Sequence, residues 1–86
     1  MIQKIFAVHD QKAEAYLPIF QLPTTAMAQR TFADCVNSSD HQFGKNPEDY
    51  TLREIAELDT DSAEITPLEI AKTICNGIEC VQSSDG

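Results

Sequence analysis

The chain has 86 residues, of which 42% are hydrophobic and 7% aromatic, and its formal net charge is −8. This length allows one domain with a thin, mainly aliphatic core, and the composition is that of a folded chain rather than a disordered one. No apolar run approaches the roughly 20 residues that span a bilayer, and the first ten residues do not match a secretory signal peptide. We therefore expect one domain over residues 1–82, a disordered tail over residues 83–86 and no membrane partner.

The negative charge is concentrated in the C-terminal half of the chain. Residues 1–45 carry as many cations as acids, whereas residues 46–86 carry two cations and ten acids. Affinity for DNA grows with the number of phosphate contacts, and the whole chain has six Lys and Arg residues. The composition therefore disfavours strong duplex binding, and the acidic half favours solubility or a basic partner.

The N-terminal region predicts two strands joined by a turn. Residues 2–9 have apolar side chains on both faces, which is typical of a central strand. Residues 10–14 are polar enough for a turn. Residues 15–22 predict an edge or irregular strand, because Pro18 cannot donate to a sheet ladder.

The strongest helix prediction covers residues 25–36, with Thr24 or Thr25 as the N-cap. Its apolar stripe consists of Ala28, Phe32, Cys35 and Val36. Residues 38–49 predict a polar loop. Its one large apolar side chain, Phe43, either packs at the edge of the core or serves as a contact residue.

The C-terminal half predicts a strand over residues 50–58, a turn over 59–62 and a short return strand over 63–65. The motif Thr66-Pro67-Leu68-Glu69 has the features of a helix start, so we expect a helix to about Cys75, ended by Asn76-Gly77. The expected fold is α+β: an antiparallel sheet of three to four strands with one helix packed on a face, in the order β-β-α-β-β, plus a short C-terminal helix.

Recognisable catalytic and metal-binding patterns are absent from the sequence. Cys35, Cys75 and Cys80 lack the spacing of a disulfide framework or a zinc site, so we expect free thiols. Neither a nucleophile elbow nor a glycine-rich phosphate loop occurs. We therefore expect a protein that is not an enzyme and uses no cofactor or metal.

Two surfaces are candidates for binding. Single-stranded nucleic acid can be held by aromatic stacking with few cations, at about 1–3 kcal/mol per base. The candidate nucleic-acid residues are Lys12, Tyr16, Arg30, Phe43 and Lys45. The candidate residues for a basic protein partner are Glu48, Asp49, Glu57, Asp59 and Asp61.

Three stretches carry a family resemblance. They are residues 10–16 with Pro18 and Phe20; the helix residues Ala28, Arg30, Phe32, Asp34, Val36 and Asn37; and residues 47–50 with Leu52, Ile55, Glu57 and Asp59. In this order and spacing they resemble the small nonstructural protein of gokushoviruses, which belong to the Microviridae. The resemblance extends over residues 5–65, and residues 66–86 match poorly.

The resemblance implies a nonstructural protein of a small single-stranded DNA bacteriophage, in a family often labelled DNA-binding. We expect an accessory role in genome replication or single-stranded DNA synthesis in the cytoplasm of the infected bacterial host. The implied partners are single-stranded DNA, bound weakly, and a phage or host replication protein; a homodimer is a further option. The alternative is an acidic interaction module that acts on a basic phage or host protein.

Overall fold

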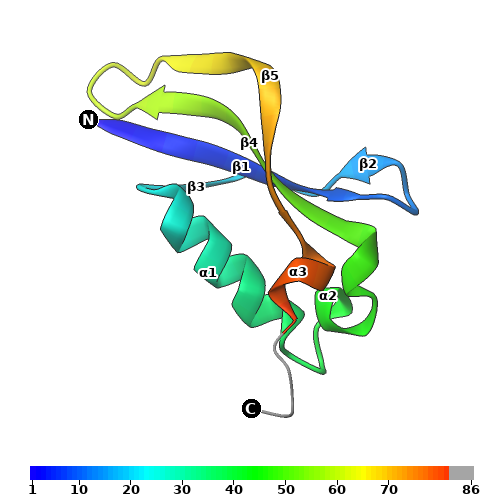
Figure 1. Ribbon diagram of the computed structural model, residues 1–86. Coiled ribbons are helices and arrows are strands. Elements are labelled where there is room, and N and C mark those ends of the chain that lie inside the picture. The colour runs from blue at the N-terminus through cyan, green and yellow to red at the C-terminus, as the bar shows by residue number, and fades with distance from the viewer. Residues whose placement is uncertain (82–86) are drawn as a thin grey trace.

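Five antiparallel strands and one long helix make up most of the computed structural model, which describes residues 1–81 (Figure 1). The strands are β1 (Ile2–Asp10), β2 (Ala15–Tyr16), β3 (Phe20–Leu22), β4 (Tyr50–Asp59) and β5 (Ile65–Asn76). Their order in the sheet is β2-β1-β4-β5, and β3 also pairs with β1. The predicted α+β class is confirmed, while the predicted tail over residues 83–86 lies outside the described residues.

The prediction that the first strand is central is confirmed. β1 pairs with β4 along one edge and with β2 and β3 along the other. Residues 5–8 of β1 are all buried, as expected for a strand with apolar residues on both faces. Pro18 lies in the break between β2 and β3, so the predicted irregular strand is two short strands.

The helix α1 (Thr25–Val36) has the predicted bounds. The Thr24 side chain caps it by accepting a hydrogen bond of 3.2 Å from the Met27 N–H. Its buried residues pack against β1 and β4, and α1, with α2 and α3 at its C-terminal end, lies on one side of the sheet (Figure 1). No helix within residues 1–81 is long and apolar enough to cross a membrane.

The predicted loop over residues 38–49 contains two short helical turns, α2 (Gln42–Lys45) and the 3-10 helix η1 (Pro47–Asp49). Phe43 is 8% exposed, and its ring centroid lies 5.6 Å from that of Phe32 and 4.5 Å from that of Tyr50. The core alternative for Phe43 is therefore confirmed. This buried ring anchors the segment, which explains why the polar stretch is ordered.

The predicted helix over residues 66–75 is wrong, because this segment forms most of β5. The residues of β5 pair with β4 in an antiparallel hairpin, with an irregularity over residues 68–71. The short C-terminal helix instead follows the strand as α3 (Gly77–Cys80). The residue expected to help end a helix, Asn76, is the N-cap of α3, where its side chain accepts a 2.9 Å hydrogen bond from the Ile78 N–H.

Tertiary pairing explains this error. A helix over residues 66–75 would leave one edge of β4 without hydrogen-bond partners, and β5 satisfies that edge. β-branched residues are frequent in β5, which favours extended structure. Pro67 is tolerated because an edge strand does not need every N–H for the ladder.

Candidate nucleic-acid interface

The face of the sheet turned away from α1 can be identified from strand alternation. Phe6, Val8 and Leu52 belong to the core cluster that includes the buried residues of α1. Successive side chains of a strand point to opposite faces. Ala7, His9 and Arg53 therefore lie on the face that α1 does not cover.

Two cross-strand rows on this face bring polar and aromatic residues together. In the first row, His9 pairs with Tyr16 on one side and Thr51 on the other. In the second row, Arg53 lies between Ala7 and Thr73. We name the polar and aromatic members the open-face cluster: His9, Tyr16, Thr51, Arg53 and Thr73. Neither row contains an acidic residue.

Arg53 is held in this cluster by neutral partners. Its Nη1 donates a hydrogen bond of 2.7 Å to the Tyr16 hydroxyl, and its Nη2 donates one of 3.0 Å to the Ala71 carbonyl oxygen. Its Nε is buried and has no hydrogen-bond partner within the described residues. Within residues 1–81, Arg53 also forms no ion pair with a carboxylate. The guanidinium charge is therefore oriented without being neutralised by an adjacent acid.

The two rings of the open-face cluster are in contact. The imidazole of His9 and the phenol of Tyr16 lie 4.8 Å apart between centroids at an interplanar angle of 63°. Tyr16 is 46% exposed, so part of its ring surface is accessible. An exposed ring beside an unpaired cation can stack on a nucleobase and attract the adjoining phosphate.

The five predicted nucleic-acid residues do not form one continuous surface. Tyr16 lies in the open-face cluster, and Lys12 lies in the neighbouring β1–β2 turn, 3.8 Å from the Asp49 carboxylate. Arg30 is exposed on α1 and Lys45 is exposed on α2, on the helical side of the sheet. Phe43 is buried in the core and offers no face for stacking.

Sequence reasoning missed Arg53 and His9 as members of a candidate site. A signal was available, because Thr51 and Arg53 have the opposite parity to the apolar Tyr50 and Leu52. The sequence did not reveal that β4 pairs with β1 and that β1 pairs with β2. These two pairings bring Tyr16 next to the guanidinium group of Arg53, although the two residues are far apart in the chain. Long-range register of this kind is not encoded in a local pattern.

The five predicted partner-binding acids lie in two separate places. Glu48 and Asp49 belong to η1, whereas Asp59 and Asp61 lie at the β4–β5 turn. The ten-residue strand β4 separates these places by about 30 Å. Glu57 lies within β4, where it pairs with Lys4 of β1.

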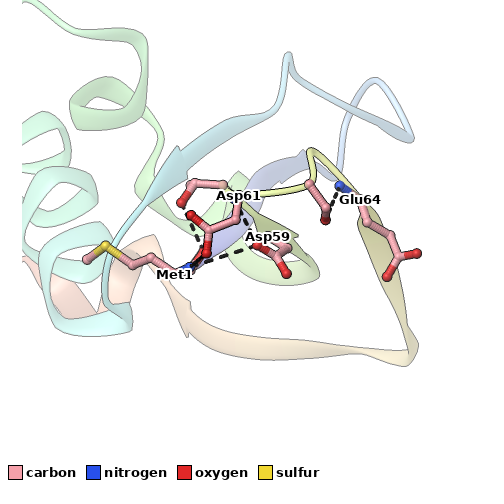
Figure 2. A network of polar contacts seen from close by, with 6 residues as sticks. Met1, Asp59, Asp61 and Glu64 are labelled. Carbon is pink, nitrogen blue, oxygen red and sulfur yellow. Dashed lines mark hydrogen bonds and ion pairs between the residues drawn. The ribbon is translucent and has the colours of Figure 1, made fainter.

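At the β4–β5 turn, two of the acidic residues, Asp59 and Asp61, lie beside the N-terminal ammonium group of the described chain (Figure 2). The Met1 nitrogen lies 2.9 Å from Asp61 Oδ2 and 3.8 Å from Asp59 Oδ1. The pKa of Asp59 is lowered, chiefly by the hydrogen bond from the Asp61 N–H and further by the ammonium charge. The negative potential of this turn is therefore partly compensated within the chain itself.

Comparison with known protein families identifies the family of this chain. A family model described as Phage ORF5 protein matches residues 3–80 of the chain. No curated protein and no solved structure matches the chain. The family match includes every member of the open-face cluster and both acidic regions.

Proposed function

The chain belongs to the Phage ORF5 protein family, and from that premise we propose that it is a non-enzymatic accessory protein of phage genome replication. We place it with the nonstructural proteins of gokushoviruses in the Microviridae, acting in the cytoplasm of the infected bacterium. Its proposed task is to support single-stranded DNA synthesis through weak, direct contact with single-stranded DNA. The partners proposed beside DNA are a replication protein of the phage or host and, as an option, a second copy of the chain.

The open-face cluster is the observation that carries the DNA contact. It combines an exposed aromatic ring with a cation that no carboxylate of residues 1–81 neutralises, and its two cross-strand rows contain no acid. Stacking on Tyr16 contributes affinity for any base, because every base has a π face. Arg53 and Lys12 supply cationic groups for phosphates, and this small number keeps the affinity low and dependent on salt.

Replacing Tyr16 with alanine should weaken binding of a fluorescein-labelled oligothymidylate by about 5- to 150-fold, which corresponds to the loss of about 1–3 kcal/mol of stacking. The measurement is fluorescence anisotropy at low salt, with the wild-type curve repeated at rising salt. The wild-type affinity should fall as salt rises. Circular dichroism should show an unchanged fold, because Tyr16 is exposed and lies in a two-residue strand.

Two charge-matched variants locate the contact. Lys12→Ala and Arg30→Ala each remove one exposed cation, but Lys12 adjoins β2 whereas Arg30 lies on α1. Lys12→Ala should reduce both the affinity and the salt slope, and Arg30→Ala should change them less. The proposal is overturned by wild-type affinity in Tyr16→Ala, by a larger effect of Arg30→Ala than of Lys12→Ala, or by the absence of binding at high micromolar protein.

A second candidate function is an acidic module that docks on a basic phage or host protein. The exposed side chain of Asp61, which is 84% accessible, and the exposed Glu48 of η1 favour it. Changing Glu48 and Asp61 to the corresponding amides should reduce recovery of such a partner in cross-linked pull-downs from infected cells. Equal recovery with the amide variant would show that these acids do not mediate docking.

A further inference from the structure

Two cysteine sulfurs lie in direct contact near the C-terminal end of the described chain. Cys75 is the penultimate residue of strand β5, and Cys80 is the final residue of α3. The Sγ of Cys80 donates a hydrogen bond to the Sγ of Cys75 over 3.4 Å, and both residues are free thiols. The proposed DNA contact makes no use of this pair.

The fold around α3 holds the two thiols together. Immediately after Cys75, the Asn76 side chain caps α3, and the Asn76 N–H donates a 2.7 Å hydrogen bond to Glu79 Oε1. Gly77 packs so closely on η1 that a Cβ atom there would lie 2.2 Å from the Pro47 carbonyl oxygen. At the other end of α3, Asn37 Nδ2 donates a 2.9 Å hydrogen bond to the Cys80 carbonyl oxygen. The chain reversal that returns Cys80 to Cys75 is thus fixed at both ends.

The two sulfurs differ in their access to solvent. Cys75 is 4% exposed and belongs to the core cluster, whereas Cys80 is partly exposed at its edge. The third cysteine, Cys35, makes no sulfur–sulfur contact within residues 1–81. A dissolved reagent therefore reaches Cys80 first, and the sulfur placed to attack the resulting adduct is that of Cys75.

We propose that Cys75 and Cys80 form a reversible dithiol–disulfide site that exchanges with low-molecular-weight disulfides such as oxidised glutathione. The Cys80 thiolate attacks one sulfur of the small disulfide, which breaks its S–S bond and releases one small thiol. The Cys75 thiolate then attacks Sγ of Cys80 and releases the second small thiol. Two protein thiols are oxidised to one disulfide, and one small disulfide is reduced to two thiols. Closing the bond to about 2.0 Å requires the sulfurs to approach by about 1.4 Å, within reach of the four-residue α3.

Burial and the neighbouring Cys80 raise the pKa of Cys75 to about 12. Burial, the larger cause, remains when Cys80 carries the glutathione adduct and keeps Cys75 mainly protonated near neutral pH. Each unit of pH then increases the Cys75 thiolate by about tenfold, so ring closure should accelerate as pH rises from 7 to 9.

Equilibration of the full chain with mixtures of reduced and oxidised glutathione tests the proposal, with acid quenching and peptide mass mapping as the readout. The expected product is an intramolecular Cys75–Cys80 disulfide, two hydrogens lighter than the reduced protein and fully reversed by excess reduced glutathione. Cys35→Ser is the matched control and should form the same product. Cys80→Ser and Cys75→Ser should each abolish it, and Cys75→Ser should accumulate the glutathione adduct at Cys80.

Three outcomes would overturn the proposal. In the first, Cys75 and Cys80 stay reduced. In the second, the wild-type protein stops at the mixed disulfide with glutathione. In the third, disulfide-linked dimers form in place of the internal Cys75–Cys80 bond. A urea titration of Cys80→Ser should show a cooperative transition, so a lost disulfide is separated from a lost fold. A ring-closure rate that does not rise with pH would overturn the role of Cys75 as the attacking thiol.

Discussion

Replacing Leu52 with alanine should lower the free energy of unfolding by about 3–4 kcal/mol, as for other fully buried leucines. Leu52 has 0% of its surface exposed and lies near the start of β4, paired with Val8 of β1 on one side and Cys75 of β5 on the other. Truncation removes buried apolar surface and leaves a cavity that the surrounding strands cannot fill. The loss is a large part of the total stability of a small domain.

Urea denaturation followed by circular dichroism measures this effect, and Ile70→Ala provides the matched control. Ile70 is also an aliphatic residue of the β4–β5 hairpin, but it is 82% exposed. Its replacement should change the free energy of unfolding by about 0.5 kcal/mol or less. Equal effects of the two substitutions would contradict the assignment of Leu52 to the core and of Ile70 to the surface.

Replacing Lys4 with methionine should destabilise the fold by about 2 kcal/mol. Glu54 is 2% exposed, and its carboxylate accepts hydrogen bonds from Lys4 Nζ at 3.4 Å and from Thr25 Oγ1 at 3.2 Å. Removing the cation leaves a buried charge with one neutral donor, a change that costs about 3–5 kcal/mol in fully buried pairs. We expect the smaller loss of about 2 kcal/mol because the Lys4 side chain is 32% exposed, so water can reach the Glu54 carboxylate from the side that Lys4 occupied.

A double-mutant cycle isolates the interaction between these two residues. Adding Glu54→Leu to Lys4→Met should recover most of the lost stability, because an apolar pair carries no desolvated charge. The measurement is again urea denaturation of the wild type, both single variants and the double variant. Strictly additive effects would show that Lys4 and Glu54 do not depend on each other.

Three elements could be predicted from sequence because their signals are local. The bounds of α1 follow from the Thr24 cap and an apolar stripe of helical period, and both signals lie within the element itself. β1 and β4 follow from dense apolar residues flanked by polar turns. In each case packing in the fold agrees with the local preference, so no competing effect overrides it.

The C-terminal segment and the candidate site could not be predicted in the same way. The motif at Thr66 has the local features of a helix start, but pairing with the edge of β4, together with the β-branched residues of β5, decides for a strand. The contact between Arg53 and Tyr16 likewise depends on strand pairing between residues that are 37 positions apart. Both outcomes are set by sheet register, which local periodicity does not report.

The shape of β5 has a consequence for the behaviour of the protein in concentrated solution. Residues 68–71 of β5 have no paired positions in β4, so the strand is irregular there. Pro67 and Lys72 flank this irregular segment at the outer edge of the sheet. Such an edge is a poor template for strand addition from another molecule. Despite its open sheet margin, the protein should resist stacking into amyloid-like fibrils.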